Sequence, residues 1–265
     1  MKLFLSLLLL VASLLSHSFS TRYDVNVGVL GKVGHGDIIF SQDDDRYEIR
    51  AIATLTGIAA TLTGNRFETY ISTGHIVNNR YLPDTFVKIK TTTRKERIQT
   101  YTFDHINKTV SLVEKKSKWV SETKFDTIAF KIISKDIQEK SSQERVLDNF
   151  TDQDVLSSYF NALHSCTSNQ QLYQIIAVGA HNEDQDITIT FLEGKKYQEV
   201  QKKYSLEAGD IYHLHVEPFD KEKDKTVDVI VMVDEDGYMK KAVLANVFWI
   251  GEVTATREKH EVFKP

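Results

Sequence analysis

Apolar and polar residues alternate with a period of two along most of the chain. From Tyr23 to Val29, and again from Tyr47 to Ala51, every second residue is apolar and the intervening residues are polar or glycine. In an extended strand, this alternation places the apolar residues on one face of a sheet. We therefore expect a mainly β protein, built on a curved antiparallel sheet that forms a barrel or half-barrel.

The segment Val227–Val233 is apolar on both faces near its end, which predicts a central strand. The Asp236-Gly237 step that follows suits a tight reversal, because Gly accepts a positive φ. We expect this strand to pair antiparallel with Tyr238–Ile250. A second glycine-rich segment, Lys32–Gly36, lacks the strand-to-helix context of a phosphate loop and predicts a bend or a close approach of two backbones.

One segment, residues 152–164, has helical instead of strand periodicity. Its apolar residues fall on one helical face: Val155, Leu156, Tyr159, Phe160 and Leu163. We expect one amphipathic helix here, packed on the open face or end of the sheet. Thr151 is the expected N-cap, and Asp154 completes a capping box. The polar stretch before the helix, Ser134–Asn149, predicts a mobile connector.

Residues 1–20 predict a secretion signal peptide. Lys2 precedes an apolar run, Leu3–Leu15, which is shorter than the ~20 residues that cross a bilayer. Small residues follow at Ser18 and Ser20, where a signal peptidase could act. We expect the mature chain to begin near residue 21 and to reside in the periplasm.

Removal of the leader leaves residues 21–265, which are enough for a single β-rich domain with its own core. Cys166 is the only cysteine, so the chain cannot form an internal disulfide and its stability must come from burial. After the leader, no apolar stretch approaches membrane-spanning length. We expect no membrane span after signal cleavage, and the sequence leaves the oligomeric state open.

The formal net charge of the chain is −4 at pH 7. Nucleic-acid binders concentrate positive charge, so we expect no nucleic-acid partner. Local basic clusters do occur, at Arg94–Arg97, Lys115–Lys118 and Lys202–Lys203, and they interrupt strand-like segments. We interpret them as solvated edges or turns.

The order of the segments carries a family resemblance. In chain order these are YDVNVGVLGKVGHGDIIF, RYEIRAIATLTGIAATL, RFETYISTGHIVNNRYLPDTF, YTFDHINKTVSL, DQDVLSSYFNAL, KKYQEV, IYHLHVEP and VDEDGYMKKAVLANVFWIGEVTATR. The set resembles the exported bacterial family known as domain of unknown function 3108 over essentially the whole mature chain. Its features are general ones, such as the Leu82-Pro83 step and a terminal hairpin. The resemblance implies an envelope-localised, β-rich domain with curved antiparallel sheets, and it supplies no activity or cofactor.

The sharpest chemical cluster is His213-x-His215-x-Glu217. Alternation along a strand places both imidazoles and the carboxylate on one face, a set that suits zinc or another divalent metal. The same alternation fits a simpler interpretation, in which these three side chains face water while their neighbours are buried. We find no serine elbow or other catalytic constellation, so we do not expect an enzyme.

Binding is the function class that the pattern favours. A curved sheet with an apolar inner face and a helix over one opening encloses space for a hydrophobic small molecule or lipid, by analogy with half-open β-barrels that carry lipids or lipoproteins in the periplasm. The candidate lining residues are aromatic: Tyr101, Phe103, Phe248 and Trp249. These residues could instead fill a solid core, and the chain would then be a structural or interaction module whose partner is another envelope protein.

Overall fold

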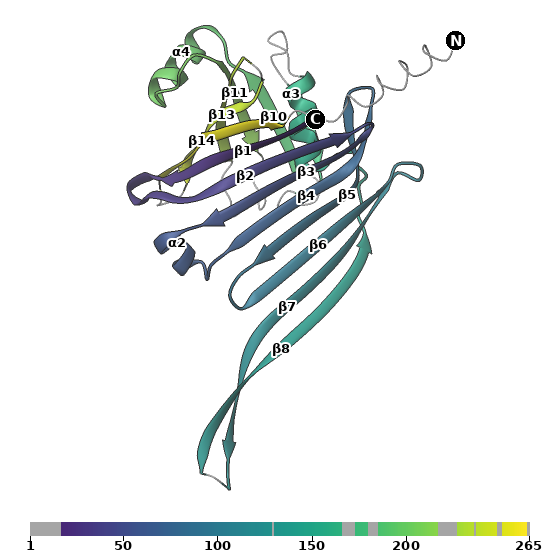
Figure 1. Ribbon diagram of the computed structural model, residues 1–265, viewed down its shortest axis with the longest axis vertical. Coiled ribbons are helices and arrows are strands. Elements are labelled where there is room, and N and C mark those ends of the chain that lie inside the picture. The colour runs from purple at the N-terminus through teal and green to yellow at the C-terminus, as the bar shows by residue number, and fades with distance from the viewer. Residues whose placement is uncertain are drawn as a thin grey trace, which may run out of the picture.

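The chain folds into one open antiparallel sheet (Figure 1). The computed structural model describes residues 17–128, 130–165, 173–179, 185–216, 227–235, 237–247 and 251–263. Within these residues the sheet has fourteen strands. They are β1 His17–Val27, β2 Gly31–Asp43, β3 Arg46–Leu55, β4 Phe67–Val77, β5 Arg80–Thr91, β6 Lys95–Asp104, β7 Thr109–Asp126, β8 Lys131–Val146, β9 Tyr173–Ala177, β10 Gln185–Phe191, β11 Asp210–Val216, β12 Val227–Val233, β13 Met239–Val247 and β14 Gly251–Phe263.

The sheet consists of two antiparallel meanders, β1 to β8 and β9 to β14, which are joined by the pairing of β1 with β14. From edge to edge it reads β8-β7-β6-β5-β4-β3-β2-β1-β14-β13-β12-β11-β10-β9. Strands that are consecutive in sequence lie side by side, except β8 and β9, which lie at opposite edges; the first and last strands, β1 and β14, pair in the middle of the sheet. β8 and β9 remain as edges, so the sheet is open. The predicted curved antiparallel sheet is confirmed, in its half-barrel form.

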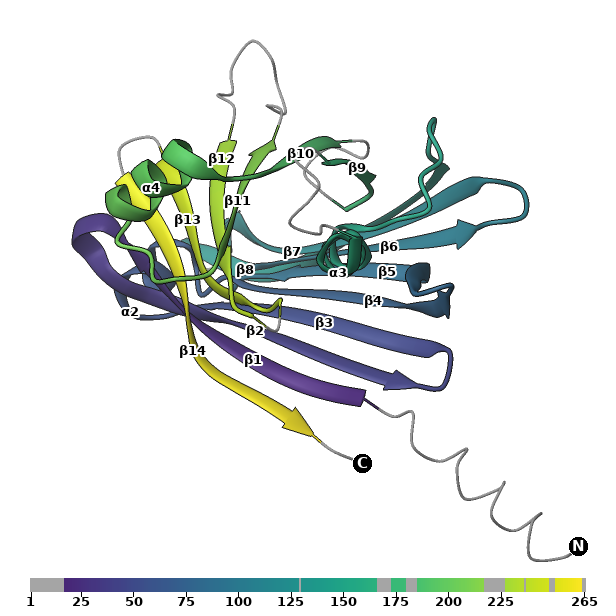
Figure 2. The same cartoon turned by 90° about the horizontal axis from the view of Figure 1, so that it is seen from above.

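The curvature gives the sheet a concave side, which holds one helix. Figure 2 shows β11 to β13 turning up from the plane of β1 to β6, with helix α3 (Val155–Ser165) in the angle between them. A second helix, α4 (Gly194–Lys203), covers the opposite face of β11 to β13. A short helix α2 (Gly57–Leu62) and a 3-10 turn η1 (Gly28–Leu30) lie in strand connections. No helix in these described ranges is both long and apolar enough to cross a membrane.

The position of β12 in the sheet explains why its sequence is apolar on both faces. Val231 and Val233 face the concave side, while Ile230 and Met232 pack with Tyr197 and neighbouring residues of α4. β12 lies between β11 and β13, and Val231 pairs with Ala242 of β13, which confirms the predicted hairpin. The strand is apolar on both faces because each face is covered.

The predicted helix is present, but its expected cap is wrong. Asp154 is the N-cap residue: its Oδ1 accepts hydrogen bonds from the amides of Leu156 at 2.7 Å and Ser157 at 3.0 Å. The Ser157 hydroxyl in return accepts from the Asp154 amide at 2.9 Å, which completes a capping box. Thr151 donates instead to the carbonyl of Ile176 on β9, because it lies three residues ahead of the true cap.

Two further sequence interpretations needed correction. Ser134–Asn149 is not a connector, because most of it belongs to β8, which pairs with β7 along its whole length. Its side chains are exposed on both faces of this edge, so it shows no alternation of apolar and polar residues. α4 was not expected either. Its few apolar residues, Tyr197 and Val200 among them, form a narrow stripe in a strongly polar segment.

The described residues begin within the expected leader. β1 starts at His17, and Phe19 is only 4% exposed. The Phe19 ring stacks on Phe40 and Phe160 with centroids 5.2 and 6.0 Å away. Residues 1–16 of the leader lie outside the described residues.

The glycine-rich start of β2 brings two backbones together, as predicted. A Cβ built on Gly34 would lie 2.2 Å from the carbonyl oxygen of Thr54, inside van der Waals contact. Gly36 has more room, with its nearest neighbour 3.7 Å away. Of these two glycines, Gly34 is the one that requires the absence of a side chain.

A basic groove as the candidate functional site

α3 fills the upper part of the concave face. The ring of Phe160 lies 5.2 Å from that of Phe40 and 5.6 Å from that of Tyr81, so the helix closes an aromatic core over β1 to β5. Tyr101 and Phe103, predicted as ligand-lining residues, are buried in the adjoining core with Phe86, Val110 and Leu112. The other two candidates, Phe248 and Trp249, lie outside the described residues.

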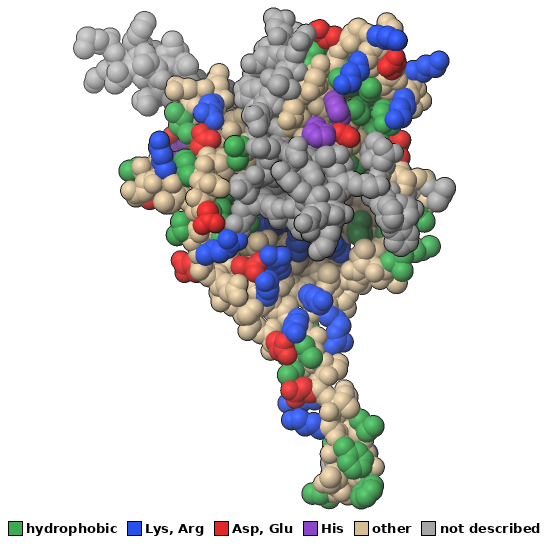
Figure 3. All heavy atoms as spheres, turned by 180° about the vertical axis from the view of Figure 1, so that it is seen from behind, with side chains coloured by type: hydrophobic (Ala, Val, Ile, Leu, Met, Phe, Trp, Pro, Cys, Tyr) green, Lys and Arg blue, Asp and Glu red, His purple; other side chains and the backbone are tan. Residues whose placement is uncertain are grey.

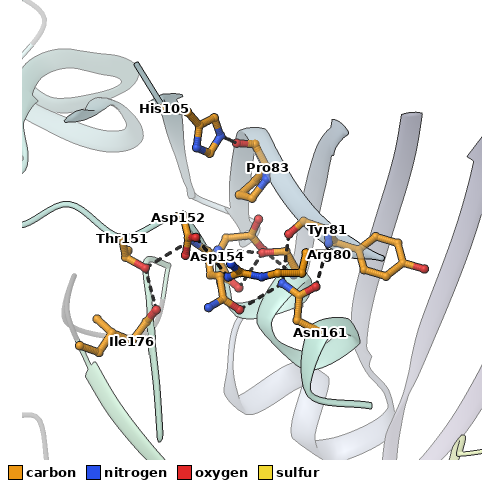
Figure 4. Close-up of polar contacts among 11 residues, drawn as sticks. Arg80, Tyr81, Pro83, His105, Thr151, Asp152, Asp154, Asn161 and Ile176 are labelled. Atoms are coloured by element: carbon orange, nitrogen blue, oxygen red, sulfur yellow. Dashed lines mark hydrogen bonds and ion pairs between the residues drawn. The ribbon is translucent and has the colours of Figure 1, made fainter. Parts of the chain in front are cut away.

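Polar contacts fix α3 to the sheet (Figure 4). The Asn161 carboxamide pairs with the backbone of Tyr81: its Oδ1 accepts from the Tyr81 amide at 2.8 Å, and its Nδ2 donates to the Tyr81 carbonyl at 3.1 Å. At the start of the segment, Arg80 forms an ion pair with Asp152 at 3.1 Å. Asn161 is 4% exposed, so these bonds are shielded from water.

The cap residue Asp154 is also the anchor of a buried chain of hydroxyls. Ser72 of β4 donates to its Oδ2 at 2.6 Å, and the Tyr47 hydroxyl lies 3.1 Å from the Ser72 Oγ. Burial raises the pKa of Asp154 to about 6, although the hydrogen bonds from Ser72 and the helix amides oppose the rise. The capping geometry explains this perturbed carboxyl, so we assign it a structural role.

Below α3 the concave face changes from apolar to charged in successive rows across the sheet. The first row lies under the helix and is mainly apolar: Ser72, Phe86, Tyr101, Leu112 and Arg145. Two residues further along each strand, the second row is polar: Tyr70, Lys88, Gln99, Glu114 and Gln143. The third row is mostly charged: Glu68, Lys90, Arg97, Lys116 and Ser141. A short fourth row follows with Lys95, Lys118 and Glu139.

The third and fourth rows line a groove of about 620 Å³. We call it the basic groove, because seven basic and two acidic residues line it: Thr63, Arg66, Lys90, Thr92, Lys95, Glu96, Arg97, Lys116, Ser117, Lys118, Glu139, Lys140 and Ser141. Figure 3 shows Lys and Arg side chains gathered in a band across this face of the sheet. Strand alternation turns Lys140 and Glu96 to the opposite face, and the other six basic residues remain directed into the groove.

Two carboxylates, Glu68 of the third row and Glu114 of the second row, are each shared between two cations. Glu68 contacts Arg66 and, at 3.4 Å, Lys90, and it accepts a hydrogen bond from the Tyr70 hydroxyl. Glu114 contacts both Arg97 and Lys116. Each set of one acid and two bases therefore keeps a net positive charge.

The pKa of both carboxyls is set by opposing effects. Burial favours the neutral form, yet the pKa of each lies below its ordinary value. For Glu68 the Tyr70 hydrogen bond and the Lys90 and Arg66 charges outweigh burial, and for Glu114 the bonds from the neighbouring cations do so. Both are ionised at neutral pH.

Lys88 lies in the second row, between the apolar row and the groove. Its Nζ donates to the Gly179 carbonyl at 2.9 Å and lies 5.5 Å from the ring centroid of Tyr70. Burial, followed by the charge of Lys90, lowers the pKa of Lys88 to about 8. This lysine therefore lies between the aromatic core and the charged rows.

The groove was not predicted from the sequence, because its charged residues come from separate segments. Arg94–Arg97 and Lys115–Lys118 were interpreted as solvated edges or turns. Instead, alternate residues of the two clusters lie side by side in the sheet, with Arg97 opposite Lys116 and Lys95 opposite Lys118. The available signal was that both clusters sit in strands, where every second residue shares a face.

The two histidines of the predicted metal cluster lie on the other face of the sheet. His213 Nε2 and His215 Nδ1 each lie 2.9 Å from the same oxygen, Oδ1 of Asp228 on β12. The hydrogen bond with His215 and, more weakly, that with His213 lower the pKa of Asp228 although burial opposes this. Glu217, the predicted third ligand, lies outside the described residues, and within them no group of three or more His, Cys, Asp or Glu side chains is placed to hold a metal. A metal site here stays a prediction.

A second, smaller pocket lies between α3 and the upturned strands. It has a volume of about 150 Å³, with Tyr159, Tyr212 and Val231 among its walls and Asp234 at its rim. Small-molecule sites usually enclose ~300–1,000 Å³. The pocket is therefore too small to be the main ligand site.

Comparisons with protein families, with curated proteins and with solved structures found no match to this chain. The resemblance to the exported family stays a prediction. The function of the groove is therefore argued from its own residues.

Proposed function

We propose that this chain is an exported, non-enzymatic binding protein that holds an anionic amphiphile in the basic groove. The observation that carries the proposal is the excess of positive charge in one groove of about 620 Å³, on a chain whose formal net charge is −4. A cationic site on an otherwise acidic chain selects anions instead of attracting them over the whole surface.

The rows beside the groove favour an amphiphile over a simple anion. Apolar side chains such as Phe86 and Leu112 lie two rows above Lys90 and Lys116. The long stems of Lys and Arg also present aliphatic surface beneath their charged ends. A phosphate or carboxylate head group would meet the ammonium and guanidinium groups, and its apolar portion would lie along the stems.

This proposal narrows the hydrophobic-ligand hypothesis. The apolar part of the concave face is occupied by α3, and the pocket left beside the helix measures only about 150 Å³. An uncharged ligand would therefore find little apolar space among the described residues. The signal-like leader and the resemblance to an exported envelope family support a periplasmic location, next to membranes that contain anionic phospholipids.

The test is a comparison of head groups on purified full-length mature protein. Isothermal titration calorimetry would measure binding of lysophosphatidylglycerol, lysophosphatidylcholine and glycerol phosphate. We expect the anionic lysolipid to bind at least about tenfold more tightly than the zwitterionic one, since charge-assisted hydrogen bonds contribute ~1.5–3 kcal/mol each. Binding of glycerol phosphate with equal affinity would mean that the site recognises the phosphate alone.

A matched pair of variants locates the site. Lys90→Gln with Lys116→Gln removes two groove cations and leaves Glu68 and Glu114 with less compensation, so affinity for the anionic lysolipid should fall by about tenfold or more. Lys195→Gln with Lys196→Gln removes the same charge from exposed positions on α4 and should leave affinity unchanged. Equal effects of the two pairs, or no binding by the wild type, would refute the proposal.

A second candidate function rests on the filled upper core. Because α3 closes the aromatic cluster around Phe40 and Phe160, the chain could instead be an interaction module that binds another envelope protein. Native mass spectrometry of protein purified from the producing cells separates the two, since it would show either a lipid-sized or a protein-sized addition. The same preparation tests the metal prediction: the metal content of a His213→Ala, His215→Ala variant should fall if these residues bind a divalent ion.

A further inference from the structure

The hairpin of β7 and β8 extends well beyond the rest of the sheet (Figure 1). The last pair between β6 and β7 joins Lys95 to Lys118. Beyond it, the ladder between β7 and β8 continues alone, from the pair Trp119 with Gln138 to the pair Asp126 with Lys131. The end of the hairpin is thus a two-stranded ribbon without other strands beside it.

Large apolar side chains gather at the end of this ribbon and are exposed. We call them the apolar tip: Phe125, Ile128, Phe130, Ile132 and Ile133, with exposed fractions of 56%, 96%, 83%, 71% and 43%. The rings of Phe125 and Phe130 meet edge to face with centroids 5.7 Å apart. Figure 3 shows apolar side chains at the far end of the projecting hairpin. Contiguous exposed apolar surface of this kind commonly marks an interaction site.

The shape and charge of the ribbon indicate what covers the tip. A narrow projection fits poorly against a flat protein surface, whereas a lipid bilayer deforms around it. Lys124 and Lys131 flank and enter the tip, and Lys135 lies two residues beyond Ile133. The carboxylates of this segment are Asp126, Asp136 and Glu122, and Glu122 lies 3.6 Å from Lys124. Lysines so placed can keep their ammonium groups at the head-group level while apolar neighbours enter the acyl boundary.

The basic groove begins where the ribbon leaves the sheet. Lys116 and Lys118 of β7 belong to its third and fourth rows and still pair with β6, next to the start of the ribbon. Positive charge behind an apolar tip complements a surface of anionic lipids.

We propose that the apolar tip inserts into the interface of a lipid bilayer that carries anionic head groups. The hairpin is the docking element, and the sheet remains outside the bilayer. This inference goes beyond ligand binding and does not depend on it, because it rests on the exposed side chains of the tip.

The test is flotation of full-length mature protein with vesicles of phosphatidylcholine and phosphatidylglycerol in equal parts, and with vesicles of phosphatidylcholine alone. We expect the wild type to float with the mixed vesicles and less with the neutral ones. Ile128→Ser with Phe130→Ser should reduce the bound fraction by about tenfold or more, since burial of such side chains is strongly favourable. Ile106→Ser is the matched control, because Ile106 is 93% exposed in the turn between β6 and β7, away from the tip.

A second readout reports insertion directly. Phe130→Trp should show a blue shift of tryptophan emission on addition of mixed vesicles, and brominated lipids should quench it. Ile106→Trp, in the same background of two native tryptophans, should show neither change. These exposed positions are not needed for folding, so thermal unfolding should be unchanged in all the variants.

Three outcomes would overturn the proposal. The first is absence of vesicle binding by the wild type, and the second is unchanged binding by the tip variant. The third is that the tip variant alters only the oligomeric state in sedimentation velocity, which would assign the tip to self-association. Lysolipid titration separates this inference from the proposed function. The tip variant should keep groove binding, and Phe130→Trp combined with Lys90→Gln and Lys116→Gln should still show the tryptophan shift.

Discussion

Replacement of Asp154 by asparagine is expected to remove a pH dependence from the stability of the fold. The carboxyl is fully buried and its pKa is raised to about 6 from an ordinary value of 3.8. Asparagine keeps an Oδ1 to accept from the amides of Leu156 and Ser157, and its Nδ2 can donate to the Ser72 hydroxyl. The substitution therefore preserves the helix cap while it removes the titrating group.

The magnitude and sign follow from the raised pKa. Below a pH of about 4 the carboxyl is protonated in the folded and unfolded chains alike. Between about pH 4 and pH 6 the unfolded chain releases its proton while the folded chain retains it, so rising pH favours unfolding. The difference between 3.8 and about 6 corresponds to about 3 kcal/mol at ~1.4 kcal/mol per pH unit, lost by neutral pH. Relative to wild type, Asp154→Asn should gain this amount between about pH 4 and pH 7.

The assay is urea unfolding, followed by far-ultraviolet circular dichroism at several pH values across this range. The difference in free energy of unfolding between variant and wild type isolates Asp154 from other carboxyls, such as Glu68 and Glu114, whose lowered pKa values act in the opposite direction. Asp152→Asn, at a half-exposed ion pair, should change stability by less than about 1 kcal/mol. A constant difference between Asp154→Asn and wild type across the pH range would refute the reasoning.

Asp154→Ala separates the cap from the charge. It removes the acceptor for two helix amides, a loss of about 1 kcal/mol. It also leaves the buried Ser72 hydroxyl without its acceptor, which adds about 1–3 kcal/mol. We expect this variant to be less stable than Asp154→Asn at every pH.

Three further predictions concern the core. Gly34→Ala should destabilise the fold by about 2 kcal/mol or more in urea unfolding, because its Cβ would overlap the Thr54 carbonyl, whereas Gly36→Ala should be nearly neutral. Asn161→Ala should cost about 3 kcal/mol, since it leaves a buried backbone amide and carbonyl of β5 unpaired; a loss below about 1 kcal/mol would contradict the docking role. N-terminal sequencing of secreted protein should show a chain that begins at or before Phe19, because cleavage after residue 20 would remove a ring from the core and cost about 3 kcal/mol.

The candidate site was only partly readable from the sequence. Its strands were visible as alternation. Tyr101 and Phe103 were predicted to line a ligand or to fill a core, and they lie in the core above the groove. The lysines and arginines were also noticed, but as separate clusters. Their meeting on one face depends on the register between β6 and β7, which pairs Arg97 with Lys116. Register arises from long-range contacts, so a local pattern cannot supply it.

α3 illustrates the same limit. Its apolar residues predicted a helix with one buried stripe, yet Ser157, Ser158 and Asn161 on its other sides are buried as well. They are polar because they form hydrogen bonds with the cap residue, with the helix backbone and with the backbone of Tyr81 near the start of β5. A polar residue in an amphipathic helix normally faces solvent. In α3 these polar residues are buried, because the helix is enclosed within the concave face.

The apolar tip depends on strand β8, which the sequence pattern did not predict. The polar stretch from Ser134 onward has no alternation, so it was interpreted as a connector. In the structure it is the partner of β7, and the pairing extends the hairpin far enough to expose Ile128 and Phe130 at its end. Backbone pairing does not require an apolar face, so the amino-acid pattern does not reveal that these two strands pair.

The sequence by itself determined the class of fold. Its signals were the alternation with period two, the turn residues Asp236-Gly237 and the helical apolar stripe from Val155. These are local properties, on which backbone preference and burial act directly. What the tertiary structure decided is where the charges and the exposed apolar residues meet. The groove brings together residues of β5 to β8 and of the segment before β4. The tip is apolar yet exposed because the ribbon extends beyond the neighbouring strands. Such arrangements depend on which strands pair and in which register, and that is settled by the packing of the whole sheet.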